Sequence, residues 1–574
     1  MPISPAGVLK ALFISLVLAL SAYAVAKLDL FGLESASDGV ADGVYQRITA
    51  ADYGASRRGQ KTISVVSLDD TSLQTMRGYG WTRFPPTYDQ QWTMLDDLMN
   101  VGGAPPAAMY VDFVYMGEGA PDEGFGAFVD GVAAATRAKQ WSARPGCVSD
   151  PLVKIACIDA VGGTPIVLAR PSPADLDFFP DAERALDQVA VLAPALVGVK
   201  AYPLISRYEF DAATAARLGV HGFDISPAMA IYAAWCLGRR DACGIAAFRR
   251  LQARARLALQ GRASPAEDYA KVFDAPMDVV WGSRPDPDYM AITRAVSGRP
   301  APCRGEGEGW RARLGEQMVG LRGPGAGVRQ ECPYNLTLGY DRIVAGSGLD
   351  KNDLARLVAG KLVMVGGEFH ASSDWVESPV HGQVPGIQYH AMALDNLVED
   401  GIDYRRSASA MLDSDLLKSL LIGALAFCGI LAVMVRNSLL DHAMATRSES
   451  KLRPTVYGPL YVVLYGASIG MVFLATWLGV TYVHRSPINW IGISACVLGF
   501  LFYATRETLP ADVLGSIEHI GLVRRLVAAS RYCRSAMRFE EDRLLSRPPA
   551  KSNPAASPQP TRPKQQKAPV HAPT

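Results

Sequence analysis

The sequence has no excess of charge of either sign, and it lacks recognisable catalytic motifs in its polar regions. Its 574 residues include 57 Lys and Arg and 56 Asp and Glu, a formal net charge of +1. A balanced charge argues against a protein that binds nucleic acid through bulk positive charge. No Walker A or HExxH sequence is present, so the sequence does not indicate a P-loop nucleotide-binding protein or a zinc metalloprotease. We therefore expect no enzymatic activity, no cofactor and no nucleic-acid partner.

Charged residues are scarce, at 20% of the sequence, and hydrophobic residues make up 49%. This composition excludes a largely disordered chain. Strongly apolar runs nevertheless occupy only a minor part of the length, which excludes a transporter built of many spans. The composition instead suits a membrane-anchored protein with a large water-soluble part.

Four apolar runs are long enough, or nearly so, to cross a bilayer as helices, which takes about 20 residues. We predict transmembrane helices at 8–26, 416–435, 457–480 and 488–504. Any single run also suits a buried core helix. The first run has a further alternative, because Ala22-Tyr23-Ala24 fits a signal-peptidase site, so it is either an uncleaved anchor or a signal peptide. Both readings export the chain that follows residue 26.

Charge asymmetry sets the predicted orientation. Residues 27–415 carry 38 basic and 48 acidic side chains, whereas 505–574 carry 12 basic and 6 acidic ones. The loop 436–456 is also rich in Arg and Lys. Because basic segments stay in the cytoplasm, we predict that 1–7, 436–456 and 505–574 are cytoplasmic. Residues 27–415 are then the periplasmic domain of a protein of the bacterial inner membrane.

Cysteine is rare, and six of the nine cysteines lie in the predicted exported region as three couples close in sequence. An exported region permits disulfides. Six cysteines allow fifteen pairings, and we choose the pairing by nearness in sequence. No couple has the CxxC spacing of a zinc site, so we expect no metal. The predicted disulfides are Cys147–Cys157, Cys236–Cys243 and Cys303–Cys332.

The exported region has the pattern of an α/β domain. Apolar, β-branched runs at 62–68 and 107–115 predict buried strands, and 88–100 between them has apolar residues at helical spacing. Strand, helix and strand in this order predict a βαβ unit with parallel strands. Segments 116–163 and 285–350 are rich in Gly and Pro and are predicted to be insertions held by disulfides. Further strands are predicted at 164–169, 189–192 and 361–365, and further helices at 227–237, 245–259 and 387–397.

Three blocks of the exported region carry a recognisable set of motifs. The first block, 63–115, has a strand ending in Asp-Asp-Thr-Ser, then GWTRFP, a helix, and a strand containing VDF. The others are KAYPL at 200–204 with ISPAMA at 225–230, and GKLVMVGGEFHASSD at 360–374 followed by PGIQYHA at 385–391 and DNL at 395–397. With the order of the apolar runs, these blocks resemble the second family of CHASE domains, the extracytoplasmic sensors associated with cyclases and histidine kinases.

The resemblance covers about residues 8 to 505, although the family's Trp-Pro-x-x-Arg element is only approximated. It implies an outer sensor whose state passes through the membrane helices to a cytoplasmic output domain, commonly a cyclase or a kinase. Here 505–546 predicts an amphipathic helix, and 547–574 has the composition of a disordered, Pro-rich tail. Neither segment suits a catalytic module. We therefore expect the chain to act through a separate protein partner.

Acidic residues near the carboxyl ends of the predicted strands are the candidate site, because those ends converge on one crevice of a parallel sheet. We expect Asp70 and Asp374 to face one another with Asp112 below them. Arg83 would neutralise the empty site, and His390 lies on the closing helix. Such carboxylates suit a cation or a cationic small molecule. The alternative is structural: Asp70 and Asp112 cap helices or accept backbone bonds, and His390 is a satisfied helix residue.

Two functions fit these observations. The leading hypothesis is a membrane-bound sensor or signal-transducing subunit that acts through a partner. The alternative is a structural or docking subunit of a larger cell-envelope assembly, with 116–163 and 285–350 as contact surfaces. A deep, partly polar cavity over the sheet favours sensing, whereas a filled crevice beside an exposed apolar patch favours docking.

Overall fold

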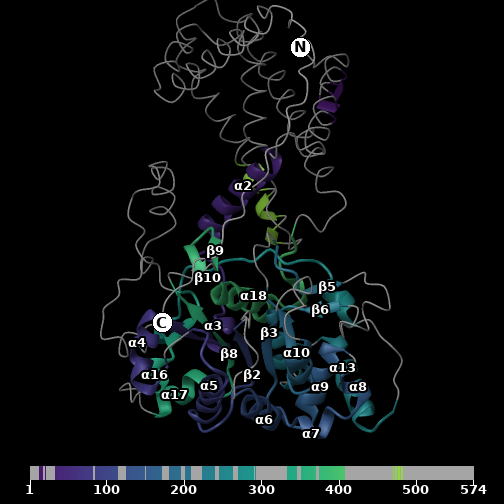
Figure 1. Ribbon diagram of the computed structural model, residues 1–574. Helices are drawn as coiled ribbons and strands as arrows, with labels where there is room; N and C mark the ends of the chain where they lie inside the picture. The colour runs from purple at the N-terminus through teal and green to yellow at the C-terminus, as the bar shows by residue number, and fades with distance from the viewer. Residues whose placement is uncertain are drawn as a thin grey trace, which may run out of the picture. The chain divides into compact units, whose positions relative to one another are not determined.

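A computed structural model describes most of the region predicted to be exported (Figure 1). The described residues are 33–81, 84–113, 124–148, 150–170, 180–195, 201–207, 223–238, 243, 245–262, 269–289, 291, 333–344, 351–369 and 374–407, with isolated positions between 9 and 20 and between 470 and 481. Within these ranges no helix combines the length and the apolarity that a membrane crossing needs. The predicted helices 416–435 and 488–504, like the segments 436–456 and 505–574, lie outside the described residues.

The centre of the domain is a six-stranded sheet with the order β4-β3-β2-β8-β1-β7, in which every neighbouring pair is parallel. The prediction of an α/β domain with a mostly parallel sheet is therefore confirmed. Two short antiparallel pairs, β5 with β6 and β9 with β10, stand apart from it. The strands are β1 Ile63–Asp69, β2 Ala108–Asp112, β3 Ile166–Arg170, β4 Val191–Pro194, β5 Ile205–Arg207, β6 Phe223–Ile225, β7 Leu336–Gly339, β8 Leu362–Glu368, β9 Trp375–Ser378 and β10 Gly382–Pro385.

The strands of the sheet are apolar on both faces, as parallel strands covered by helices should be. Val65 and Val66, which point to opposite faces of β1, are both fully buried. The predicted unit of β1, helix α5 (Tyr88–Asn100) and β2 is parallel, but its strands are not neighbours. β8 lies between them, and its Val363 pairs with Ser64 of β1 and with Met109 of β2.

Helices cover both faces of the sheet. Figure 1 shows α18 (Gly386–Asp400) on one side, and α5 and α6 (Phe125–Ala135) on the other. Helix α12 (Pro227–Gly238) packs beside α18, and it is buried from Pro227 to Leu237, because its sequence is apolar all round. The other helices with described bounds are α2 Leu33–Thr49, α3 Arg58–Thr62, α4 Asp70–Met76, η2 Arg77–Tyr79, α7 Ala138–Trp141, α8 Pro145–Val148, α9 Pro151–Ala160, α10 Pro180–Asp187, α13 Ala246–Leu259, η4 Tyr269–Phe273, α16 Asp341–Val344, α17 Lys351–Val358 and η5 Gly401–Asp403.

The predicted insertion 116–163 holds the disulfide expected of it, Cys147–Cys157, and the described residues 125–160 contain the four helices α6 to α9, which the sequence pattern did not predict. Its prolines do not break these helices. Pro145 and Pro151 are the first residues of α8 and α9, where proline costs no hydrogen bond. The predicted insertion 285–350 contains a strand of the main sheet, β7, and the short helix α16.

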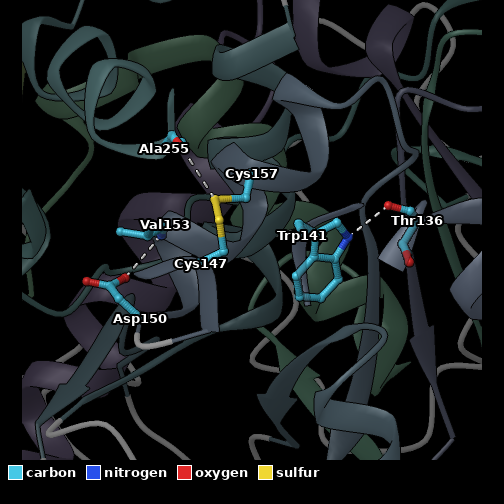
Figure 2. Close-up of a disulfide and its surroundings, with 7 residues drawn as sticks. All are labelled: Thr136, Trp141, Cys147, Asp150, Val153, Cys157 and Ala255. Atoms are coloured by element: carbon cyan, nitrogen blue, oxygen red, sulfur yellow. Dashed lines mark hydrogen bonds between the residues drawn. A yellow bond between two sulfur atoms is a disulfide. The ribbon is translucent and has the colours of Figure 1, made fainter. Parts of the chain in front are cut away.

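Two of the predicted disulfides are present. Cys147 and Cys157 join α8 to α9 with their Cα atoms 5.9 Å apart, and Cys236 and Cys243 have their Cα atoms 5.4 Å apart. Figure 2 shows the first disulfide facing the carbonyl of Ala255 on α13. The disulfide therefore links α8 to α9, and both helices pack against α13. Cys303 and Cys332 lie outside the described residues.

Candidate functional site

A buried carboxylate ends strand β2. Successive residues of a strand point to opposite faces, so Tyr110 and Asp112 share the face that α18 covers. The Tyr110 hydroxyl donates a hydrogen bond to Asp112 Oδ1 at 2.7 Å. The side chain of Asp112 is only 8% exposed. The strand thus delivers a carboxylate into the interface between the sheet and α18 and holds one of its two oxygens.

His390 faces this carboxylate from the second turn of α18. Its Nδ1 is hydrogen-bonded to the hydroxyl of Tyr202 at 2.7 Å, and that hydroxyl also accepts a bond from the backbone N–H of Ala228 at 3.3 Å. The other ring nitrogen, Nε2, lies 4.0 Å from Asp112 Oδ2. This distance is too long for a hydrogen bond, so the two groups face one another without being bonded.

Asp374 completes a trio of titratable groups with Asp112 and His390. Its backbone carbonyl accepts a bond from the N–H of Gly386, the first residue of α18. A Cβ on Gly386 would lie 2.3 Å from Asp374 Oδ1, so the carboxylate approaches the helix closely only because this residue is glycine. Burial and the charge of Asp112 raise the pKa of Asp374, while His390 lowers it. The two carboxylates are therefore electrostatic neighbours.

Burial sets the protonation of the Asp112 and His390 side chains. It raises the pKa of Asp112 to about 6, against the effect of the Tyr110 hydrogen bond. It lowers the pKa of His390 to about 4, although the charge of Asp374 acts in the opposite direction. Loss of water disfavours the charged form of both groups. At neutral pH the site consequently holds a carboxylate beside a neutral imidazole.

The acidic edge continues onto β8. Asp112 pairs with Gly366 in the sheet, and Glu368, two residues further along β8, lies on the same face. Gln388 of α18 donates to Glu368 Oε1 and to Thr337 Oγ1, both at 2.9 Å. Burial raises the pKa of Glu368, and the hydrogen bond from Gln388 opposes this shift.

Two of the predicted site residues are placed differently or not described. Asp70 is the exposed first residue of α4, and the cap of that helix is its neighbour Asp69, which accepts from the N–H of Ser72 at 2.6 Å. Since β8 separates β1 from β2, Asp70 follows a strand roughly 10 Å from β2, at about 4.8 Å per strand. Arg83 lies outside the described residues. We therefore centre the site on Asp112, Asp374 and His390.

Sequence reasoning missed Tyr110, Tyr202, Glu368 and Gln388. Alternation along the strand was a usable signal for Tyr110, since it lies two residues before Asp112. Tyr202 had no such signal, because its contact with His390 joins segments that are 188 residues apart. In the described part of the chain, no group of three His, Cys, Asp or Glu is arranged to hold a metal ion.

No family model, curated protein or solved structure matches this chain. The resemblance to the second CHASE family thus remains a prediction drawn from the motifs. Residues 466–470 read GASIG, which matches the GxSxG pattern of α/β-hydrolases. It lies within the apolar run 457–480, whereas the hydrolase motif requires a turn between a strand and a helix. It gives no support for an enzyme.

Proposed function

We propose that the chain is a membrane-bound sensor or signal-transducing subunit. Its α/β domain lies in the periplasm, four transmembrane helices anchor it, and it acts through a separate protein partner. The observation that carries the proposal is the position of α18. The first turns of this helix hold Gln388 and His390 at the site, and its carboxyl end leads through η5 directly to Arg405.

Arg405 joins the two parts of the chain that continue toward the predicted membrane helices. Its guanidinium is buried and contacts Asp278 Oδ2 at 2.7 Å and Asp42 Oδ1 at 3.2 Å. Asp42 lies on α2, which follows the predicted helix 8–26, whereas Arg405 precedes the predicted helix 416–435. A displacement of α18 would therefore act on both exits together.

A second connection runs from the site through the segment around Met277. Tyr202, which is bonded to His390, exchanges two backbone hydrogen bonds of 2.8 Å with Met277. Met277 also bridges to Arg406, and the N–H of Asp278 donates to the carbonyl of Arg405 at 2.9 Å. A contiguous path of hydrogen bonds thus leads from the site to the exits, and this connection supports the proposal. The disulfides and the charge asymmetry also support an exported domain.

The test is affinity purification of the tagged, full-length protein in mild detergent. We expect a specific partner that is retained by the wild type and lost when 505–574 are deleted, because that segment is the predicted cytoplasmic contact. Recovery of the protein alone under every condition would contradict the proposal. A partner that survives this deletion and is lost on changes in the outer domain would favour the docking subunit instead. A reporter fused after Arg447 should be cytoplasmic.

A further inference from the structure

Two segments of the domain are strongly basic. Residues 137–148 and 245–262 together carry eight Arg and Lys side chains and no acidic one, whereas the rest of 27–415 carries 30 basic and 48 acidic side chains. Positive charge is therefore concentrated in two short stretches of a domain that is otherwise acidic. The eight side chains belong to Arg137, Lys139, Arg144, Arg249, Arg250, Arg254, Arg256 and Arg262.

The two basic segments pack against one another. Helix α8 contacts α13, and a Cβ on Gly146 would lie 3.0 Å from the Cβ of Ala258. Figure 1 shows α7, α8, α9 and α13 grouped together. The disulfide between Cys147 and Cys157 ties α8 to α9, and the second disulfide ties the chain just before α13 to α12. The surface is thus held in a fixed shape before any partner binds, which lowers the entropic cost of binding.

Helix α13 presents its arginines to solvent and its apolar residues to the domain. Phe248 and Leu251 are buried on one side of the helix. Arg249 and Arg256 are exposed on the other side, seven residues and therefore about 10 Å apart along one stripe. The exposed Ala253 lies between them. Because its side chain is small, a partner can approach the helix between the two guanidiniums.

The residues on this face suit a protein partner better than a lipid bilayer or a nucleic acid. A helix that binds a bilayer inserts apolar side chains into it, and single-stranded nucleic acids stack on aromatic rings. Neither kind of side chain is exposed on α13. The guanidinium is a planar fork that binds a carboxylate through two parallel hydrogen bonds. The exposed residues of α13 are Ala246, Arg249, Arg250, Ala253 and Arg256.

We propose that the α13 face, defined by Arg249, Ala253 and Arg256, is a docking surface for an acidic segment of another protein, whose carboxylates pair with the two guanidiniums. A helix with Asp or Glu seven residues apart presents its carboxylates at the same spacing of about 10 Å. Charge complementarity of this kind speeds association and fixes the register of the partner. The proposal goes beyond the proposed function, because it concerns a partner of the outer domain and involves neither Asp112 nor the segment 505–574.

The test is the binding of a short, fluorescent poly-L-glutamate to the full-length protein in phosphatidylcholine nanodiscs, followed by fluorescence anisotropy. We expect binding that weakens as salt is added. Arg249→Gln and Arg256→Gln should each weaken it about two- to fivefold, the range for an exposed ion pair, and the double variant should weaken it further. The control combines Arg77→Gln and Arg356→Gln, which change exposed arginines on η2 and α17, and it should keep the wild-type affinity.

A second variant separates charge from geometry. Arg249→Lys combined with Arg256→Lys keeps both charges and removes the fork, so its affinity should lie between those of the wild type and the double glutamine variant. Because the changes are on the surface, the urea midpoint of every variant should equal that of the wild type.

Equal affinity of the wild type and the double glutamine variant would overturn the proposal. Two other results would overturn it in favour of a different occupant. In the first, phosphatidylglycerol vesicles bind more tightly than poly-L-glutamate, and the double glutamine variant loses that binding. In the second, the chain associates with itself at low salt and the variant does not. The assay leaves 505–574 intact and needs no co-purified protein, so its result is independent of the test of the proposed function.

Discussion

Two neighbouring strands of the sheet end in buried ionisable side chains, and the two side chains have different partners. β3 ends at Arg170, which contacts Glu183 Oε1 at 3.1 Å and is also bonded to Asp224. β2 ends at Asp112, which faces a neutral imidazole. Although burial lowers it, the two carboxylates raise the pKa of Arg170 overall. Burial alone therefore does not decide how a charged group behaves. Arg170 is paired with two carboxylates and stays charged, whereas Asp112, which among the described residues accepts one bond from the Tyr110 hydroxyl, has its pKa raised to about 6.

The largest effect should come from removing the compensation at β3. Arg170→Met leaves Asp224 and Glu183 partly buried without their cation. Breaking a buried ion pair from one side costs about 3–5 kcal/mol, so we expect a loss of this size in the free energy of unfolding, measured in urea. Arg184→Met, an exposed neighbour on α10, should change it by less than about 0.5 kcal/mol. A small loss in Arg170→Met would show that the two strand ends do not differ in this way.

His390→Gln should change how stability depends on pH. The folded pKa of His390, about 4, lies below the unfolded value of about 6.5. Below pH 6.5 the unfolded state therefore binds a proton that the folded state does not, and the wild type loses stability as the pH falls to 4. The variant lacks this loss, so relative to the wild type it should gain up to about 3 kcal/mol over that range. Urea unfolding at several pH values measures it. A constant difference would contradict the assignment.

Asp112→Asn should stabilise the protein at neutral pH. The folded pKa of Asp112, about 6, lies above the unfolded value of about 3.9. Above pH 6 the folded state therefore carries an ionised carboxylate that burial disfavours, and this cost disappears as the pH falls toward 4. We expect a gain of about 3 kcal/mol at pH 7.5 that shrinks to about 1 kcal/mol at pH 4.5. Asp130→Asn, which removes an exposed carboxylate on α6, is the matched control. A destabilised Asp112→Asn at pH 7.5 would mean that the carboxylate is compensated.

The smallest effect belongs to Asp70. It is exposed at the start of α4, so Asp70→Asn should alter the free energy of unfolding by less than about 0.5 kcal/mol at pH 7.5 and at pH 5. Urea unfolding at the two pH values is the measurement. A pH-dependent change above about 1 kcal/mol would return Asp70 to the site and restore the predicted pairing with Asp374.

The sequence predicted most of the sheet because parallel strands are apolar on both faces and stand out as runs. β7, Leu336–Gly339, was missed because its buried leucines alternate with Thr337 and Gly339 in a segment rich in Gly and Pro, so no continuous apolar run marks it. The helices of 125–160 were missed because the segment was judged by its Gly and Pro content alone. Pro145 and Pro151 each begin a helix, a position in which proline does not interrupt it. Asp112 and Asp374 were predictable as acids at or beyond strand ends. Which of them meet depends on strand order, and β8 lies between β1 and β2 for reasons that no local pattern contains.

The position of β8 also determines how late in synthesis the centre of the sheet can form. Residue 362 begins the strand that separates β1 from β2, so almost the whole domain must be synthesised before these two strands acquire their shared neighbour. Contacts this distant in sequence form slowly. Until they form, β1 and β2 each expose an unpaired edge, which is a template for aggregation. A chain that stops before residue 362 lacks β8, so the edges of β1 and β2 that β8 covers stay unpaired. The centre of the sheet can therefore form only after almost the whole domain has been synthesised.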